Sequence, residues 1–278
     1  PVVAARGGVY FSAGGDLVLA GLLTSGAVSV MGFAQTLYVL PISLFGMSIA
    51  ASELPELSRM GGEAERVVAD RVARSLRRVL YFLIPSTLAY VALGDVIVAA
   101  LYETGEFGAV ETLVTWGVLA AYAIGLPASA SSRVLSSAFY ALRDTRTPAR
   151  IAYLRVATAI LVGVTLMVPA DEFGFGALRL GAAGLALGAS AGAWLEYVLL
   201  RRALGKMIGT HGPGSHTVVR VSLAAALATM VAVGLQSILP NAHPIVVALE
   251  TVLPFGVIFL SVTALLGVGT QWRRLAET

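Results

Sequence analysis

The chain alternates long apolar stretches with short segments that are rich in charged and turn-forming residues. A helix that crosses a bilayer needs roughly 20 mostly apolar residues, and about eight stretches meet that requirement. In chain order they cover residues 3–23, 28–54, 75–93 with a short continuation to 102, 113–142, 148–168, 180–200, 218–239 and 245–268. The pattern therefore predicts an all-α polytopic membrane protein with about eight transmembrane helices.

Two parts of this pattern are less regular. The first stretch is interrupted by several glycines and by Asp16. Residues 63–78 mix charged residues with Val and Ala, which predicts an amphipathic helix lying on the inner membrane surface before the third span. A solvated extension of that span explains the same residues equally well.

Basic residues gather in alternate loops, which predicts the orientation of the chain. The loop after the second span holds Arg59, Arg66, Arg71, Arg74, Arg77 and Arg78, and the loop after the fourth holds Arg143, Arg146 and Arg150. The loop after the sixth span holds Arg201, Arg202, Lys206 and Arg220, and the tail holds Arg273 and Arg274. The opposite loops hold Glu103, Glu106 and Glu111; Asp171 and Glu172; and Asn241 and His243. The positive-inside rule therefore places both chain ends in the cytoplasm.

Composition supports the membrane assignment. The chain is 57% hydrophobic and 13% charged, with a mean hydropathy of +0.84, whereas an ordinary soluble domain is about 25% charged. The net charge of +3 is no signal for nucleic acid, because the basic residues lie between apolar runs. Cysteine is absent, which excludes disulfides and thiolate chemistry. The start at Pro1 predicts a piece of a longer protein, cut before a membrane helix.

Proline and glycine positions within the spans indicate helix geometry. Pro41, Pro85 and Pro127 each remove a backbone hydrogen bond, so each predicts a kink that serves either as a hinge or cavity wall or as a packing bend. Three glycines recur every fourth residue in the sixth span and predict close helix packing rather than a nucleotide loop, which would need a preceding strand. They are Gly184, Gly188 and Gly192.

Ionisable residues inside spans are the candidate functional groups, because each is unfavourable in the bilayer unless it is paired or hydrated. Asp16 lies deep in the first span, Arg133 in the fourth and Arg155 in the fifth, and Glu196 lies near the cytoplasmic end of the sixth. Arg133 and Glu196 are close enough to the inner interface to snorkel. Asp16 predicts either a buried ion pair, with Arg155 as one candidate partner, or a cation or proton site.

Water-exposed catalytic chemistry is not indicated. His211 and His216 lie in a loop that contains Gly and Pro, without carboxylates or cysteines nearby, so we expect no metal there. No Ser/His/Asp arrangement, Walker loop or catalytic carboxylate pair stands on a soluble segment, and we do not expect an enzyme.

Three blocks in order resemble one known family. Residues 15–59 include LYVLPISLFGMSIAASELPELSR, residues 101–107 read LYETGEF, and the third block runs AIGLP at 123–127, AFYA at 138–141 and DTRTP at 144–148. Together they resemble the MurJ/MviN lipid II flippase family of the MOP exporter superfamily. The blocks cover about half of the chain, and the last three spans match mainly by position and hydropathy.

The resemblance implies helices 7–14 of a two-lobe transporter of the bacterial inner membrane, with the amino-terminal lobe missing. Residues 1–202 would form the second six-helix lobe, residues 203–217 a cytoplasmic loop, and residues 218–278 two further helices and a tail. The implied substrate is an undecaprenyl-linked peptidoglycan precursor that is moved by alternating access. Implied partners are that lipid, membrane lipids, the missing lobe and cell-wall synthesis proteins, but no nucleic acid. No cofactor is implied, and coupling to sodium, protons or the membrane potential stays open.

The family's functional positions map onto this chain only in part. Asp16 falls where the family has an acidic residue linked to sodium, which makes it a weak sodium-site candidate. In the fifth span, which supplies further sodium ligands in some family members, this chain has Arg155 at the comparable depth. Arg155 therefore suggests that this pair serves coupling or gating and not sodium binding. Arg133 matches a basic position that would attract the anion. Gln35 and Thr36 replace an Asp-Arg pair of the cavity wall, which leaves the substrate in question.

Two alternatives therefore remain. The chain could belong to another MOP exporter, which moves a different polyprenyl-linked glycan or a drug-like cation. It could also be a non-transporting scaffold that recruits envelope-synthesis enzymes through its basic loops.

Overall fold

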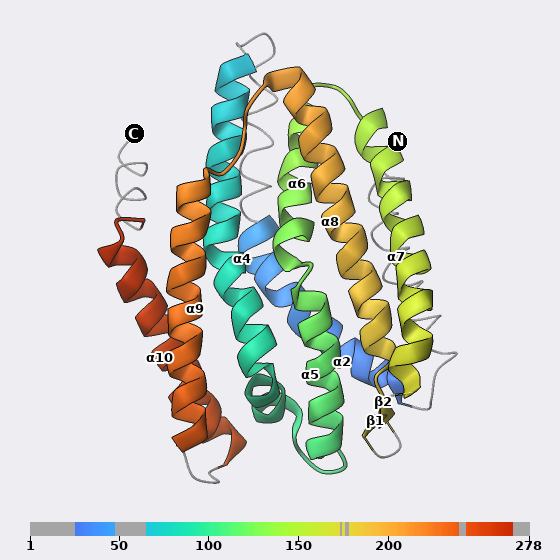
Figure 1. Ribbon diagram of the computed structural model, residues 1–278, viewed down its shortest axis with the longest axis vertical. Coiled ribbons are helices and arrows are strands. Elements are labelled where there is room, and N and C mark those ends of the chain that lie inside the picture. The colour runs from blue at the N-terminus through green and yellow to red at the C-terminus, as the bar shows by residue number, and fades with distance from the viewer. Residues whose placement is uncertain (1–25, 48–64, 173, 176–177, 239–242, 269–278) are drawn as a thin grey trace.

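The fold is a bundle of long helices (Figure 1). The computed structural model describes residues 26–47, 65–172, 174–175, 178–238 and 243–268. Its elements are α2 (Ala27–Pro41), the π-helix η1 (Ile42–Met47), α4 (Glu65–Tyr102), α5 (Ala109–Ala123), α6 (Leu126–Ala141), α7 (Arg146–Glu172), the strands β1 (Gly174–Phe175) and β2 (Leu178–Arg179), α8 (Gly181–Ile208), α9 (Ser215–Ile238) and α10 (Pro244–Leu265). The two short strands pair antiparallel between α7 and α8.

Within these described ranges, 7 helical stretches are long and apolar enough to cross a membrane. Helices α5 and α6 act together as one such stretch, from Ala109 to Ala141. The predicted all-α polytopic fold is therefore confirmed. The first predicted span, with Asp16, lies outside the described residues.

Helix α4 is far longer than a single membrane crossing needs. It has 38 residues, or about 57 Å at 1.5 Å per residue, against a hydrocarbon core of about 30 Å. From Glu65 onward, the helix continues without a break into the third span, which agrees with the second interpretation of this segment, an extension of the span, and not with a separate surface helix. Val68, Val72 and Leu76 are buried at a spacing of four residues, so one face of this extension packs against the bundle.

The buried side chains form two hydrophobic clusters that share α4. The larger cluster joins α2, α4, α5, α6, α7 and α8, and the smaller one joins α4 to α9 and α10. Two polar contacts link the last helices to α4: the hydroxyls of Tyr81 and Thr263 lie 3.0 Å apart, and Gln236 donates to Asp95 at 3.0 Å. Asp95 lies in the short continuation of the third predicted span, residues 94–102, and was not among the predicted intramembrane charges.

Helices α7 and α8 pack unusually closely. A methyl group at Gly184 would lie 2.7 Å from the backbone of Leu166, and one at Gly192 would lie 2.7 Å from the carbonyl oxygen of Arg155. At Gly188 a methyl group would collide with the backbone of Gly163. These glycines therefore serve helix packing, as predicted.

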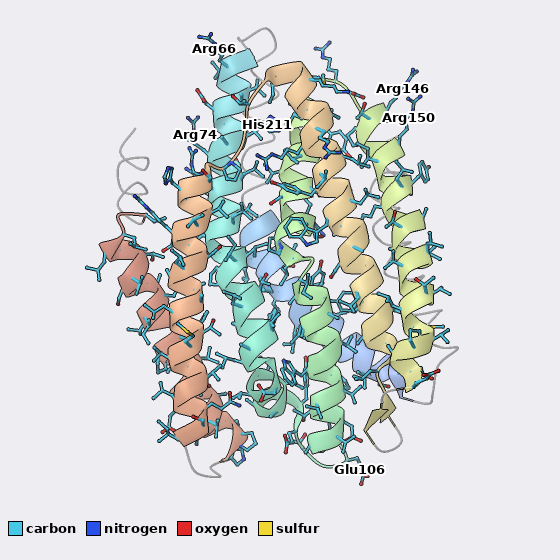
Figure 2. All side chains as sticks on the ribbon, in the orientation of Figure 1. Arg66, Arg74, Glu106, Arg146, Arg150 and His211 are labelled. Carbon is cyan, nitrogen blue, oxygen red and sulfur yellow. The ribbon has the colours of Figure 1, made fainter. Side chains whose placement is uncertain are left out.

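Charge is distributed unequally between the two ends of the bundle. Arg66, Arg74, Arg146 and Arg150 lie at one end, which we call the basic end, whereas Glu106 lies at the other (Figure 2). This arrangement agrees with the alternation of basic and acidic loops along the sequence.

Candidate functional site

Gln35 and Thr36 lie on different faces of α2. The side-chain amide of Gln35 donates to the hydroxyl of Tyr122 on α5 at 3.0 Å, and the ring of Tyr38 lies 5.3 Å from that of Tyr122. Thr36 is exposed and donates to the carbonyl oxygen of Gly32 in its own helix at 2.9 Å. Of the two predicted wall residues, Gln35 is therefore part of the α2–α5 contact, and Thr36 faces outward.

Pro41 ends α2 and leaves a backbone carbonyl without its helical donor. A proline at position i cannot bond the carbonyl of residue i−4, which here is Leu37. The hydroxyl of Tyr90 on α4 donates to the Leu37 oxygen at 2.7 Å. The carbonyl is thus satisfied by another helix, which is how membrane proteins tolerate such breaks.

Pro127 has the same consequence at the break between α5 and α6. The carbonyl it frees is that of Ala123, whose oxygen lies 3.2 Å from the Thr87 hydroxyl; the single proton of that hydroxyl is shared with the carbonyl oxygen of Leu83 at 2.8 Å. Thr87 and Tyr90 are three residues apart, so they share one face of α4. Helix α4 therefore supplies hydroxyl donors to the proline breaks of two neighbouring helices.

Helix α8 holds the α5–α6 break from the other side. The Ser190 hydroxyl donates to the carbonyl oxygen of Ala121 at 2.6 Å, and the indole N–H of Trp194 donates to that of Ile124 at 2.9 Å. Gly125 allows this approach, because a methyl group there would lie 2.8 Å from the Cα of Ser190. Side chains of the neighbouring helices α4 and α8 therefore stabilise the break between α5 and α6.

Arg155 and Glu196 form an ion pair between α7 and α8. The distance from Arg155 Nη1 to Glu196 Oε2 is 2.7 Å, and their side chains are only 15% and 10% exposed. Helix α8 continues to Ile208, which places Glu196 roughly three turns inside its end and not near it. The expected pairing of Arg155 with Asp16 lies outside the described residues, and the partner seen here is Glu196.

Arg133 lies midway along α6 and is half-buried between buried Ser132 and Val134. Its backbone carbonyl accepts from the Ser137 hydroxyl at 2.9 Å. Serines at 129, 131, 132 and 137 are buried on the same helix, so α6 carries an unusually polar surface into the bundle.

Asp144, in the DTRTP block, lies just before the first residue of α7. Its carboxylate accepts from the backbone N–H groups of Arg146 and Thr147, each at 3.0 Å. Hydrogen bonds from the Thr147 side chain and backbone are the main cause that lowers the pKa of Asp144 below its usual value. This block therefore encodes a helix cap.

Among the described residues, no group of three or more His, Cys, Asp or Glu side chains could hold a metal ion. The weak sodium-site candidate, Asp16, is not among them.

The sequence alone did not identify the donors Thr87, Tyr90, Ser190 and Trp194. The prolines indicate where such donors are needed, because each intramembrane proline leaves the carbonyl four residues earlier without its helical hydrogen bond. The identity of that donor depends on which helices are neighbours.

Comparisons with known proteins give a consistent result. A model of the lipid II flippase MurJ family matches residues 10–255. The chain is 33% identical over 177 residues to the probable lipid II flippase MurJ of Rhizobium meliloti (strain 1021), covering 63% of this chain and 31% of that protein. It is 31% identical over 189 residues to the lipid II flippase MurJ of Burkholderia cenocepacia, covering 68% and 35%.

The fold also matches a solved structure, described as lipid II flippase MurJ in an inward closed conformation. The TM-score is 0.78 at 20% identity, over 99% of this chain and 52% of the solved one. The match spans about a third of the curated relatives and about half of the solved chain. The match to the family model extends over most of the sequence, and the chain belongs to the lipid II flippase MurJ family.

Proposed function

We propose that this chain forms the second lobe and the last two helices of a bacterial inner-membrane flippase for lipid-linked peptidoglycan precursor. Transport by alternating access moves the lipid headgroup between leaflets and needs no covalent chemistry. The observation that carries the proposal is the family match across residues 10–255, which includes both the polar helix α6 and the broken α5–α6 span.

The division of the chain follows from this proposal. Residues 1–202 form the lobe, residues 203–217 the cytoplasmic connection, which includes the end of α8 and the start of α9, and residues 218–278 the additional helices and tail. The separate hydrophobic cluster of α9 and α10 on α4 supports this division. The basic end faces the cytoplasm, so both chain ends lie there, with the positive-inside rule as support.

Each candidate residue has a role in this scheme. Thr36, exposed on α2, faces the cavity enclosed with the amino-terminal lobe, and Gln35 supports this wall through its hydrogen bond to Tyr122. Arg133 attracts the anionic headgroup. Arg155 takes part in gating through its ion pair with Glu196. Asp16 couples transport to sodium, protons or the membrane potential. The substrate contact that the family places at position 36 is supplied by the amino-terminal lobe.

Depletion of the protein in living cells tests the proposal. We expect the lipid-linked peptidoglycan precursor to accumulate in the inner leaflet, because its polar headgroup cannot cross the bilayer unaided. A hydrolase added from outside would then cleave little of it, and a wild-type copy of the gene would restore cleavage.

Two outcomes would contradict the proposal and identify an alternative. Accumulation of a different polyprenyl-linked glycan alone would indicate another exporter, which the Gln35-Thr36 departure favours. Normal precursor cleavage together with mislocalised synthesis enzymes would indicate a scaffold.

A further inference from the structure

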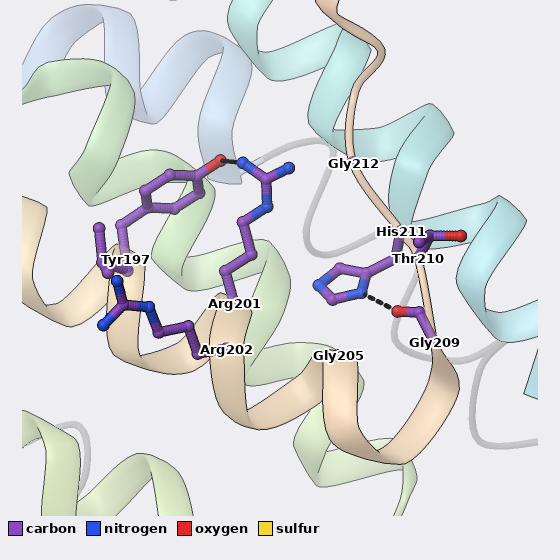
Figure 3. Close-up of a pocket in the computed structure, with 9 residues that line it drawn as sticks. Tyr197, Arg201, Arg202, Gly205, Gly209, Thr210, His211 and Gly212 are labelled. Carbon is purple, nitrogen blue, oxygen red and sulfur yellow. Dashed lines mark hydrogen bonds between the residues drawn. The ribbon is translucent and has the colours of Figure 1, made fainter.

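A pocket lies at the basic end of the bundle, where α8 ends and the chain turns toward α9 (Figure 3). Its volume is about 550 Å³. Residues 197–205, from the last three turns of α8, form one wall, and residues 209–212 form the other. The proposed transport function makes no use of this pocket.

The pocket is positively charged. Arg201 and Arg202 line it, and none of the described residues that line it is acidic. Arg201 Nη1 donates to the hydroxyl of Tyr197 at 3.3 Å, and its guanidinium carbon lies 6.0 Å from the centre of that ring. The guanidinium also approaches Gly212 so closely that a methyl group there would lie 2.7 Å from Arg201 Nη2. Arg201 is therefore oriented by its neighbours.

Arginines alone would not indicate a binding site. Basic side chains are favourable at the carboxyl end of a helix, where they oppose the helix dipole, and they are common at the cytoplasmic ends of membrane spans. His211 provides a second and independent indication that the pocket binds a ligand.

His211 is only 4% exposed, and its ring lines the pocket. Its Nδ1 lies 2.8 Å from the carbonyl oxygen of Gly209, so Nδ1 must carry the proton, because a carbonyl only accepts. In the neutral ring Nε2 is then an acceptor, and this buried atom has no hydrogen-bond partner among the described residues. Figure 3 shows this side of the ring turned toward Arg201.

The turn that places His211 depends on Gly209. This residue ends α8 with φ of 75°, in the left-handed region that favours glycine. The resulting bend brings the Gly209 carbonyl to the imidazole. The backbone thus fixes which ring nitrogen faces the pocket.

We propose that this pocket binds the headgroup of an anionic phospholipid that carries a hydroxyl group, as phosphatidylglycerol does. The two guanidinium groups suit the phosphate diester, and His211 Nε2 accepts from a headgroup hydroxyl. A membrane lipid is the natural source, because the pocket lies at the basic end of a helix that is long and apolar enough to cross a membrane. This site is independent of the flippase proposal.

Native mass spectrometry of the purified protein in detergent, with phosphatidylglycerol added, tests the charge requirement. The Arg201→Gln/Arg202→Gln variant is expected to bind the lipid about tenfold more weakly, because it loses the charge-assisted hydrogen bonds to the phosphate. The matched control is Arg146→Gln/Arg150→Gln, which removes two exposed arginines from the same end of the bundle. An equal loss in both variants, or in neither, would overturn the proposal.

Headgroup variation tests the role of His211. Phosphatidylmethanol has the same charge but no hydroxyl, so we expect the protein to bind it several-fold more weakly than phosphatidylglycerol. The His211→Phe variant keeps a ring in place and is expected to lose this discrimination. Equal binding of the two lipids by the unmodified protein would contradict the assignment. Displacement of phosphatidylglycerol by inorganic phosphate at equal concentration would overturn the lipid as occupant and assign a soluble anion.

Discussion

At the scale of single residues, the sequence shows which side chains are unusual for a membrane span, but not which of them contact each other. Arg155 and Glu196 both stand out as charges inside spans, and yet their pairing depends on the register between α7 and α8. Helical periodicity gives the face on which a side chain lies, but not the helix it faces. The glycines of α8 set that register, because only they permit the close approach at Arg155 and Ala159.

Removing one partner of this ion pair should destabilise the protein more than removing both. Arg155→Gln or Glu196→Gln leaves a largely buried charge uncompensated, and we expect each to lower the free energy of unfolding by about 2–4 kcal/mol. The double variant leaves no charge behind and should lose less than either single variant. Thermal unfolding in one detergent measures all three.

The exposed Arg146 provides the matched control, because Arg146→Gln should leave the unfolding midpoint nearly unchanged. If the loss of unfolding free energy in the double variant equalled the sum of the two single losses, the two charges would not interact. The ion pair would then contribute nothing to stability.

At the scale of helices, periodicity predicts the spans well and their interruptions poorly. The fourth predicted span, residues 113–142, contains Pro127, but the structure divides it into α5 and α6 at Ile124 and Gly125. Whether such a proline bends a helix or breaks it depends on donors for the freed carbonyls. Those donors, such as Thr87 and Ser190, lie 36 and 69 residues away from their acceptors, so no local pattern shows them.

The α7–α8 contact provides a direct test of packing at this scale. Gly188→Ala places a methyl group against the backbone of α7, which cannot move as a flexible side chain would, so we expect a loss of roughly 1–3 kcal/mol. The measurement is the thermal unfolding midpoint in detergent.

Gly234→Ala is the matched control, because Gly234 lies within α9 and a methyl group there would meet nothing within 4 Å. Alanine favours the helix over glycine, so this control should be unchanged or slightly more stable. Equal midpoints for the two variants would argue against the tight α7–α8 contact.

At the scale of the whole molecule, composition and loop charges were sufficient to predict a polytopic helical protein, and the bundle confirms that fold. Helix α4 joins the two hydrophobic clusters, and its hydroxyls reach the breaks in α2 and in the α5–α6 span. This central role was not predictable, because the sequence of α4 shows an apolar span with a charged extension but not which helices surround it. Its neighbours follow from three-dimensional packing alone.

Lipid movement in reconstituted vesicles tests the central claim most directly. Labelled lipid II is placed in one leaflet, and its arrival in the other leaflet is timed. We predict that vesicles holding the protein with both lobes will move lipid II well above the protein-free rate, whereas this chain alone will not, because alternating access needs two lobes that move against each other. Binding of lipid II without any movement above the protein-free rate, in vesicles that hold both lobes, would contradict the account.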